Sequence, residues 1–282
     1  MKSVLITGAS TGIGRASALR LDADGWRVFA GVRREENAEA LREVASERLV
    51  PLILDVTDSE QIAAAAERVG EDLGDAGLDG LLNNAGIGVG GVLEFVQLDD
   101  LRRQLEVNVV GQVAVTQPML PLLRTGRGRI VLISSDNGRW APPYMGPYAA
   151  SKFALEALGD VLRVELRRSG VSVSIVEPGS IRTSIWDKGL GAIDELDLPE
   201  ESAMLYGDVV GVLRKAVEQG KRNGIPPERV AEAIHHALTA RRPKTRYRVG
   251  RDARAMIALR AVLPDRAFDS AVHRVLRRLE KR

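Results

Sequence analysis

The sequence contains no cysteine and only three histidines, and both shortages exclude classes of function. Without cysteine the chain can form no disulfide, no thiol-based catalytic site and no cysteine-ligated zinc or iron site. His235 and His236 are adjacent and would point about a hundred degrees apart on a helix, whereas His273 lies far away in the sequence. Because these residues form no ligand set, we expect no protein-bound metal.

The sequence also lacks a long hydrophobic run. No apolar stretch reaches the roughly 18 to 20 residues that a membrane-spanning helix needs. The chain enters a strand-like run at residues 3–6, without the charged and then apolar leader of a signal peptide. We therefore expect a cytoplasmic protein. Its 282 residues suffice for one large α/β domain or two small ones with a substantial core.

The net charge of +2 is unevenly distributed. Residues 241–282 contain 14 Lys or Arg and 4 Asp or Glu, a net of +10, and residues 1–240 contain 26 and 34, a net of −8. We expect this basic end to pack on the domain or to be solvated, and peripheral contact with an anionic membrane is the alternative. Nucleic-acid binding is not expected, because the basic segment has no interleaved aromatic residues for base stacking.

A glycine-rich turn joins an apolar run to a helix near the start of the chain. Residues 7–14 read TGASTGIG, and an amphipathic segment follows over residues 15–23. A strand, a glycine turn and a helix place backbone N–H groups against a pyrophosphate. Gly8 would allow the tight turn, Gly12 the approach of phosphate and Gly14 the packing of helix on strand. We expect a dinucleotide site here, with an ordinary strand-to-helix loop as the alternative.

The end of the second expected strand, residues 26–32, bears on the choice of dinucleotide. In NAD-binding folds a carboxylate about 20 residues after the glycines binds the ribose 2′-hydroxyl, whereas an arginine receives the 2′-phosphate of NADP. Val32 stands near that position and is followed by Arg33 and Arg34. We therefore favour NADP(H) with Arg33 as the phosphate ligand, and NAD(H) is the alternative. A solvated turn opposite Glu35 would also explain the two arginines.

Further apolar runs alternate with helical segments along the chain. This alternation predicts right-handed βαβ units and hence an α/β fold, a Rossmann-type doubly wound parallel sheet of about seven strands with helices on both faces. Ligands of such sheets bind beyond the carboxyl ends of the strands. Strands are expected at residues 3–6, 26–32, 52–56, 78–82, 128–135, 171–176 and 247–249, and helices at about 15–23, 99–124, 148–158, 227–240 and 253–279, the last interrupted at Pro264.

Tyr148 and Lys152 stand four residues apart in a helix-forming segment, and Ser135 precedes the tyrosine by thirteen positions. Residues i and i+4 share one face of a helix, so the ammonium would lie beside the phenol. A free tyrosine titrates near 10, and a neighbouring positive charge favours the phenolate. We therefore expect Lys152 to lower the pKa of Tyr148 and make it a usable acid or base. By itself, such a pair is typical of a solvated helix face.

Taken in order, these segments resemble the short-chain dehydrogenase/reductase family, in the single-domain branch that includes retinol and hydroxysteroid dehydrogenases. The resemblance covers residues 2–183 closely and 184–250 loosely. The matched motifs are T-G-x-x-x-G-x-G at residues 7–14, N-N-A-G at 83–86, the helix asparagine Asn108, the active-site serine Ser135, Y-x-x-x-K at Tyr148 and Lys152, and the P-G turn at Pro178 and Gly179.

The resemblance implies an oxidoreductase that transfers a hydride between a nicotinamide cofactor and an apolar small-molecule alcohol or ketone. Tyr148 would be the general acid in reduction and the base in oxidation, and Ser135 would hold the substrate oxygen. Lys152 would assist Tyr148 and bind the nicotinamide ribose, while Asn108 would hold a water that links Lys152 to solvent. With Arg33, the expected cofactor-binding residues are Gly8, Ser10, Thr11, Gly12, Ile13, Gly14, Asp55, Asn84, Ala85, Gly86, Tyr148, Lys152, Pro178, Gly179, Ile181 and Thr183.

The resemblance also bears on domains and assembly. We expect a catalytic domain at residues 1–250, with a substrate lid at about 184–224, and a basic helical extension at 251–282. Family members commonly pair through the helices that carry Asn108 and Tyr148, so a homodimer or homotetramer is expected. The family often has a small apolar pair where this chain has Asp136 and Asn137, which predicts a more polar pocket. The alternative function is a non-catalytic dinucleotide sensor or scaffold on the same fold.

Overall fold

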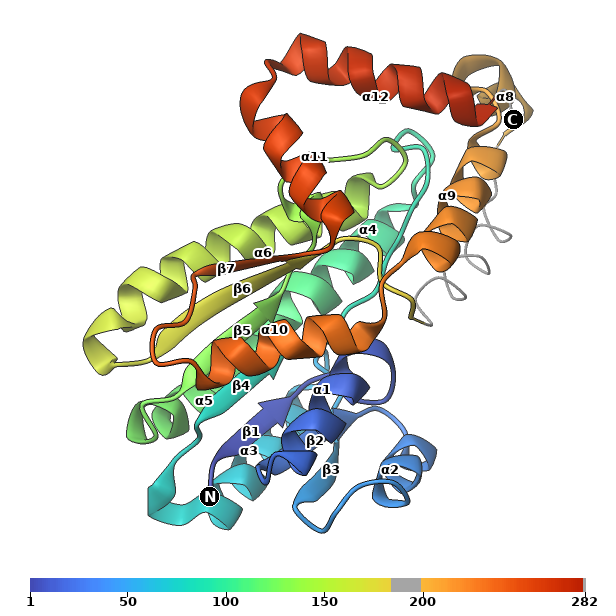
Figure 1. Ribbon diagram of the computed structural model, residues 1–282. Helices are drawn as coiled ribbons and strands as arrows, with labels where there is room; N and C mark the ends of the chain where they lie inside the picture. Colours follow the sequence, from blue (N-terminus) through green and yellow to red (C-terminus); the bar gives the residue numbers. More distant parts are fainter. Residues whose placement is uncertain (184–198, 281–282) are drawn as a thin grey trace.

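Within residues 1–183 and 199–280, which the computed structural model describes, seven parallel strands form one sheet in the order β3-β2-β1-β4-β5-β6-β7 (Figure 1). The order reverses between β1 and β4, which is where ligands of doubly wound sheets bind. The expected fold class is confirmed. The strands are β1 (Ser3–Ile6), β2 (Arg27–Val32), β3 (Leu49–Ile53), β4 (Gly80–Asn83), β5 (Arg129–Ile133), β6 (Ser172–Pro178) and β7 (Arg246–Val249).

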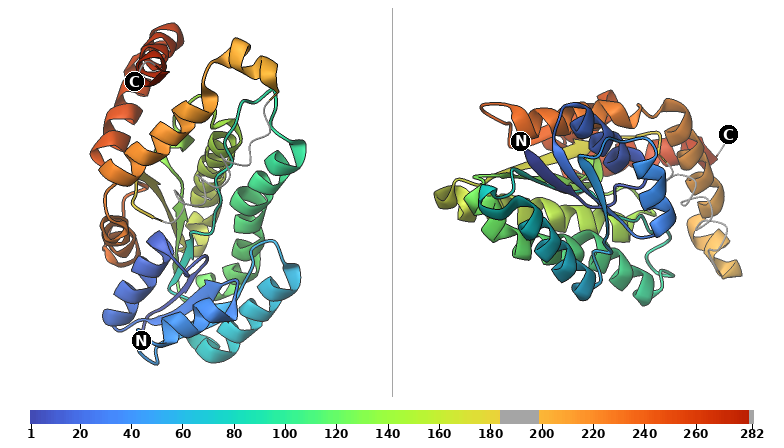
Figure 2. Two further views of the ribbon diagram at one scale, coloured as in Figure 1. Left: turned by 90° about the vertical axis from the view of Figure 1, so that its right-hand side faces the viewer. Right: turned by 90° about the horizontal axis from the view of Figure 1, so that it is seen from below.

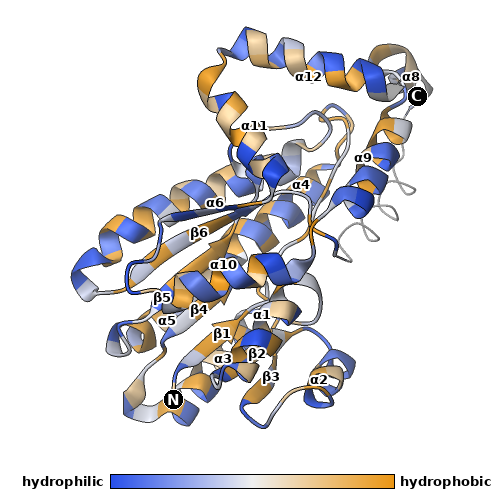
Figure 3. Ribbon diagram, in the orientation of Figure 1, coloured by the Kyte–Doolittle hydropathy of each residue, from blue (hydrophilic) through white to orange (hydrophobic). Residues whose placement is uncertain are grey.

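Helices cover both faces of the sheet (Figure 2). On one face α1 (Gly12–Ala23) packs against α10 (Pro227–Thr239), with α2 (Glu35–Arg42) beside them. On the other face lie α3 (Ser59–Leu73), α5 (Gly111–Thr125) and α6 (Gly146–Glu165). Each layer has its own hydrophobic core, because a parallel sheet buries side chains on both faces. Figure 3 shows the hydrophobic strands in the interior and β7 as a hydrophilic exception.

The third strand begins earlier than the sequence predicts. β3 spans Leu49–Ile53 instead of residues 52–56, and it includes Pro51. Proline cannot donate a ladder hydrogen bond, and strands that contain it are usually found at the edge of a sheet. β3 is an edge strand, which pairs with β2 alone. The proline is therefore tolerated here, although in the sequence it suggests the start of the strand.

The helix expected over residues 99–124 is interrupted by a change of pitch. α4 (Leu98–Leu105) is followed by a π-helical turn, η2 (Glu106–Val110), and then by α5. Such turns are rare in proteins as a whole, and those that occur are often found at functional sites. Asn108 lies in this turn, so the change of pitch sets the direction of its side chain.

Four helices of the C-terminal part of the chain lie beyond the carboxyl ends of the strands (Figure 1). They are α8 (Glu200–Tyr206), α9 (Val209–Asn223), α11 (Arg251–Val262) and α12 (Asp265–Glu280). Short 3-10 turns lie elsewhere in the chain, at η1 (Gly74–Ala76), η3 (Asp136–Gly138) and η4 (Leu166–Ser169). The expected break at Pro264 separates α11 from α12. Of the expected lid, residues 184–198 lie outside the described residues, and α8 and α9 form the remainder.

The basic end of the chain packs on the rest of the molecule. α11 contacts β7 and the η3 turn, and α12 contacts α9. Phe268 of α12 is only 5% exposed, and its ring meets the edge of the Trp140 ring at a centroid distance of 6.0 Å. This arrangement agrees with the packed alternative for the tail. Nowhere in residues 1–183 and 199–280 is a helix long and apolar enough to cross a membrane.

Candidate active site

The turns after β1 and β4 are fastened together by the Thr7 hydroxyl and the Asn84 amide. Thr7 Oγ1 accepts hydrogen bonds from the backbone N–H groups of Asn84 and Ala85, both at 2.9 Å. In return, the Asn84 side chain donates to the carbonyl oxygens of Thr7 at 2.9 Å and Gly8 at 3.0 Å. β1 and β4 are neighbours, so these bonds set the geometry of the crevice where the strand order reverses.

The glycine turn fits a pyrophosphate. Gly8 and Gly12 have φ of +67° and +56°, in the left-handed region that favours glycine. A Cβ on Gly14 would lie 2.6 Å from Asn84 Nδ2 and closer still to the Gly8 oxygen, while one on Gly12 would lie 3.0 Å from the Thr183 methyl group. α1 begins at Gly12 and carries no acidic residue in its first turn, so its positive end favours an anion.

The remaining residues predicted to bind the cofactor in this half of the sheet lie around the same crevice. Ser10 and Thr11 belong to the glycine turn, and Ile13 packs on the core beneath it. Arg33 follows β2 and is exposed, and Asp55 follows β3, the neighbouring strand. One oxygen of Asp55 accepts from Thr57 N at 3.0 Å and from its hydroxyl at 2.8 Å, which fixes the direction of this carboxylate.

Ser135, Tyr148 and Lys152 meet where β5 ends and α6 begins. Ser135 is 7% exposed and Lys152 6% exposed. The Lys152 ammonium donates a hydrogen bond to the Ile133 carbonyl at 2.8 Å and lies 5.7 Å from the centre of the Tyr148 ring. The Ser135 side chain is close enough to Tyr148 to influence the pKa of its phenol. The structure therefore brings together the three residues that the sequence pattern selects.

The protonation of this group differs from the expectation. Burial raises the pKa of Tyr148 to about 12, Ser135 opposes the rise and the charge of Asp136 adds to it. The expected lowering of the Tyr148 pKa is therefore wrong, because burial of the phenol outweighs the effects that lower its pKa. Burial also lowers the pKa of Lys152 to about 8, although the nearby Glu156 carboxylate raises it.

Asn108 links the loop after β4 to the helix that carries Tyr148. It is 1% exposed, its oxygen accepts from Ile87 N at 2.9 Å, and its amide donates to the Ile87 carbonyl at 3.0 Å and to Ser151 Oγ at 3.1 Å. Gln104, one helical turn earlier, also donates to Ile87 O and Ser151 Oγ. A Cβ on Gly86 would lie 3.3 Å from the Asn108 oxygen. No hydrogen bond joins Asn108 to Lys152 directly within the described part of the chain.

The P-G turn after β6 is held by the C-terminal part of the chain. Gly179 N donates to Val249 O at 2.9 Å, and Ser180 N donates to the Asp252 carboxylate of α11 at 2.7 Å. Ile181 is 5% exposed and pairs with Ile225, and the Thr183 side chain lies against the glycine turn. Thr183, one of the residues predicted to bind the cofactor, thus lies next to the glycine turn predicted to hold the pyrophosphate.

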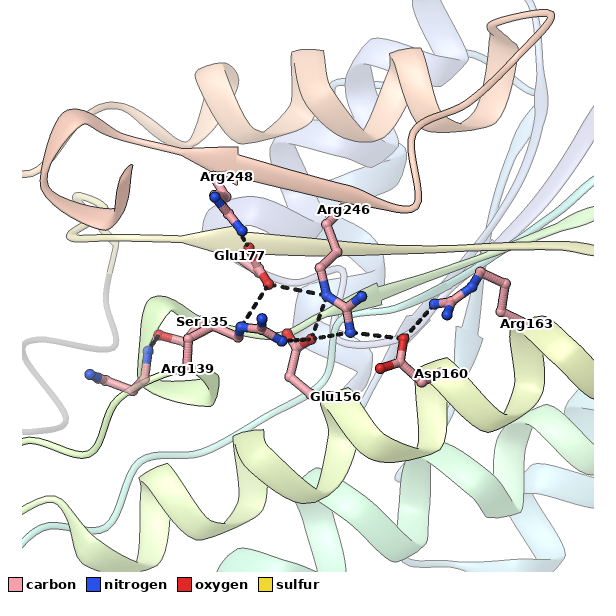
Figure 4. Close-up of polar contacts among 9 residues, drawn as sticks. Ser135, Arg139, Glu156, Asp160, Arg163, Glu177, Arg246 and Arg248 are labelled. Atoms are coloured by element: carbon pink, nitrogen blue, oxygen red, sulfur yellow. Dashed lines mark hydrogen bonds and ion pairs between the residues drawn. The ribbon is translucent and has the colours of Figure 1, made fainter. Parts of the chain in front are cut away.

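A network of charged side chains connects α6 with β6 and β7 (Figure 4). Glu177 is fully buried, and Arg246 lies 3.4 Å from it and 3.0 Å from Glu156. Arg248 and Arg139 also approach Glu177, at 3.3 and 3.8 Å. Burial and the Glu156 charge raise the pKa of Glu177, while the three arginines lower it. The network fixes α6 against the sheet and places Glu156 one turn beyond Lys152.

Several supporting residues are not predicted from the sequence. Gln104 precedes Asn108 by four residues, so a pair of amides on one helix face is the signal that would have identified it. Asp252 offers no such signal, because it lies 72 positions from Ser180. Trp140 is likewise identified only by its contacts. Residues 1–183 and 199–280 contain no group of His, Asp and Glu arranged to hold a metal ion.

Comparisons with known proteins agree with this geometry. Residues 2–190 match the family model described as short chain dehydrogenase. The chain is 36% identical over 284 residues to the NADPH-dependent 3-dehydrocapnine reductase of Ornithobacterium rhinotracheale, covering 99% of both chains. It is 39% identical to retinol dehydrogenase 5 of Mus musculus, over 98% of this chain and 89% of that protein.

The comparison with solved structures likewise identifies short-chain dehydrogenases. A short-chain dehydrogenase from Streptomyces avermitilis superposes with a TM-score of 0.78 at 31% identity, covering 98% of this chain and 97% of that one. A short chain dehydrogenase from Burkholderia cenocepacia in complex with NADP has a TM-score of 0.72 at 27% identity, covering 98% and 99%.

Proposed function

Because the chain belongs to the short-chain dehydrogenase family, we propose that it reduces the carbonyl group of an apolar small molecule with NADPH. It is an NAD(P)-dependent oxidoreductase that moves a hydride between a nicotinamide cofactor and a carbonyl or alcohol carbon. The observation that carries the proposal is the placement of the Tyr148 phenol beside Ser135 and Lys152, where β5 ends and α6 begins. Because burial raises the pKa of Tyr148 to about 12, the phenol is protonated at pH 7 and can donate its proton to a carbonyl oxygen.

The side chains have complementary roles in this proposal. A bound nicotinamide dinucleotide would supply the hydride. Ser135 orients the substrate oxygen, and the Tyr148 hydroxyl gives its proton to that oxygen as negative charge develops there. The Lys152 ammonium lies 5.7 Å from the centre of the Tyr148 ring, so its positive charge stabilises the phenolate that remains after the proton has left. Asn108 acts through position, since its bonds to Ile87 and Ser151 hold the loop after β4 against α6.

We assign the preference for NADP(H) to Arg33, with NAD(H) as the alternative. Arg33 is exposed directly after β2, where no carboxylate stands to repel a 2′-phosphate. A similar reductase is NADPH-dependent by name, and a similar structure holds NADP. Replacing Arg33 by Ala should weaken NADPH binding by about 10- to 100-fold and leave NADH binding unchanged. Arg34→Ala is the matched control, and equal affinities for both dinucleotides, unchanged in Arg33→Ala, would refute the assignment.

We also propose that residues 1–250 form the catalytic domain, with a lid at about 184–224, and that residues 251–282 form a helical extension. A cytoplasmic homodimer or homotetramer is proposed from exposed apolar side chains on the η2 turn and α6. Val110, Phe153, Val161 and Val164 are 45–69% exposed. Light scattering of wild type and of Val164→Glu tests the assembly, since an unchanged oligomer would exclude this face.

Peripheral membrane contact is the alternative for the basic end, which co-sedimentation with anionic vesicles tests.

A substrate screen tests the catalytic proposal. Ketones, aldehydes and alcohols are incubated with the enzyme and NADPH or NADP⁺, and absorbance at the NADPH band is followed. We expect NADPH oxidation with a subset of apolar carbonyl compounds. The alternative, a dinucleotide sensor on the same fold, predicts tight cofactor binding without hydride transfer to any member of the panel.

A further inference from the structure

The residue after the predicted active-site serine is a carboxylate that binds the serine directly. Ser135 Oγ donates a hydrogen bond to Asp136 Oδ1 at 3.0 Å, and Trp140 Nε1 donates to Asp136 Oδ2 at 3.3 Å. Asp136 is half-buried, and its charge also acts on Tyr148. The carboxylate therefore belongs to the region where the substrate oxygen must lie.

This bond uses the proton that the substrate needs. A serine hydroxyl carries one proton, and while Ser135 gives it to Asp136 it cannot donate to a carbonyl oxygen. A hydrogen bond to an ionised acceptor is roughly twice as strong as one between neutral groups, so a simple ketone competes poorly for the Ser135 proton. Release of Ser135 requires another donor for Asp136.

Asp136 has room for such a donor. Each carboxylate oxygen has two acceptor positions, and each Asp136 oxygen receives one side-chain donor here. No described arginine or lysine forms an ion pair with it, and the other charged group that acts on it, Asp252, is also acidic. The 3.0 Å between Ser135 Oγ and Asp136 Oδ1 resembles the spacing of two polar atoms on adjacent carbons of a ligand.

The carboxylate is also held in a fixed direction. The indole of Trp140 packs on Phe268, a buried residue of α12. α11 covers the η3 turn to which Asp136 belongs. Because two elements of the C-terminal extension support this turn, Asp136 is presented to the site as a built feature and not as a free surface side chain.

We propose that Asp136 is a specificity-determining residue that selects carbonyl substrates with an ammonium or hydroxyl donor on the carbon next to the reacting carbonyl. That donor forms a hydrogen bond to Asp136 in place of Ser135, and the Ser135 hydroxyl is then free to donate a hydrogen bond to the carbonyl oxygen. The inference rests on the proposed function and names its substrate class. Simple ketones bind more weakly because they offer Asp136 no donor, so Ser135 must give up its hydrogen bond to Asp136 without a replacement before it can bind the ketone oxygen.

Binding to the enzyme–NADP⁺ complex, which cannot reduce a ketone, tests the inference by calorimetry. α-(Dimethylamino)acetophenone is compared with its carbon isostere isovalerophenone, and α-hydroxyacetophenone with propiophenone. The wild type should bind each donor-bearing ketone about tenfold or more tightly than its isostere. The two pairs distinguish an ammonium from a hydroxyl. In Asp136→Asn, which keeps the shape and removes the charge, the ratio should fall to about threefold or less, and the isosteres should bind more tightly.

Two further variants separate this explanation from a general change of charge or folding. Asp269→Asn removes an exposed negative charge from α12, so the preference ratio should stay within about twofold. Trp140→Phe removes one donor from Asp136, which strengthens its hold on Ser135 and should increase the preference. The inference is wrong if wild type binds none of the four ketones, shows no preference, or keeps the preference in Asp136→Asn. Preference without hydride transfer would instead refute the proposed function, and hydride transfer without preference would refute only the inference.

Discussion

Replacing Lys152 by Met should stabilise the protein while it abolishes activity. Burial lowers the pKa of Lys152 from 10.5 to about 8, so the folded state binds this proton more weakly than the unfolded state. That difference costs roughly 3 kcal/mol of folding free energy at pH 7, where both states are protonated. Methionine removes this cost but also removes the hydrogen bond to Ile133, about 1 kcal/mol. The net gain is about 2 kcal/mol, or about 4 °C in Tm.

The pH dependence identifies the cause of this gain. Because the folded-state pKa of Lys152 is lowered, its cost is fully present below pH 8 and disappears as pH rises from about 8 to 10.5. Calorimetric unfolding at pH 7 and pH 10 should therefore show an advantage of Lys152→Met that is large at pH 7 and small at pH 10. Lys244→Met, at an exposed position, should show no such change. A Lys152→Met variant that is less stable than wild type at both pH values would refute the reasoning.

Three further predictions concern the surroundings of the site. Gly14→Ala should destabilise the protein by about 1–3 kcal/mol and weaken NADPH binding, because the added Cβ would lie 2.6 Å from Asn84 Nδ2. Gly70→Ala, whose Cβ would meet nothing within 4 Å, should instead stabilise the protein by about 1 kcal/mol. Urea unfolding compares the two variants, and equal effects would contradict the close packing of the glycine turn on Asn84. Arg246→Met should cost roughly 3–5 kcal/mol at pH 7, because it leaves the buried Glu177 and Glu156 without this partner. The cost should fall at lower pH, where Glu177, whose pKa is raised by burial, becomes protonated; a cost that does not depend on pH would contradict this. Reduction should lose activity above pH 8 as Lys152 deprotonates, and Glu156→Gln should move this limb to lower pH, because Glu156 raises the pKa of Lys152; an unmoved limb in the pH–rate profile would contradict the contact.

The parts of the structure that sequence predicts well are those with local signals. The glycine turn at residues 7–14 joins a strand to a helix through φ values that favour glycine, and the alternation of apolar runs and helical segments predicts the parallel sheet of seven strands. Boundaries depend on tertiary context, as β3 illustrates, since Pro51 is tolerated there because the strand lies at the edge of the sheet. The π-helical turn at Asn108 has no comparable sequence signal.

The electrostatics of the site could not be predicted from spacing. The four-residue interval places Lys152 next to Tyr148, but the direction of the pKa shift depends on burial and on Asp136, neither of which the interval contains. The partners of Lys152 also come from elsewhere, since its ammonium binds Ile133 of β5. Likewise, Asp252 reaches the P-G turn from α11, which only the folded chain brings near Ser180. Sequence therefore selects the reacting groups, and the fold determines their protonation.

The most direct test of the account is the rate of a single hydride transfer in Tyr148→Phe. The variant keeps the aromatic ring and removes the hydroxyl, and its NADPH affinity is measured first to show that the cofactor still binds. With a carbonyl substrate from the screen, rapid mixing should give a rate about 100- to 10,000-fold below wild type, because the proton donor is gone. Unchanged hydride transfer in Tyr148→Phe would contradict the central claim.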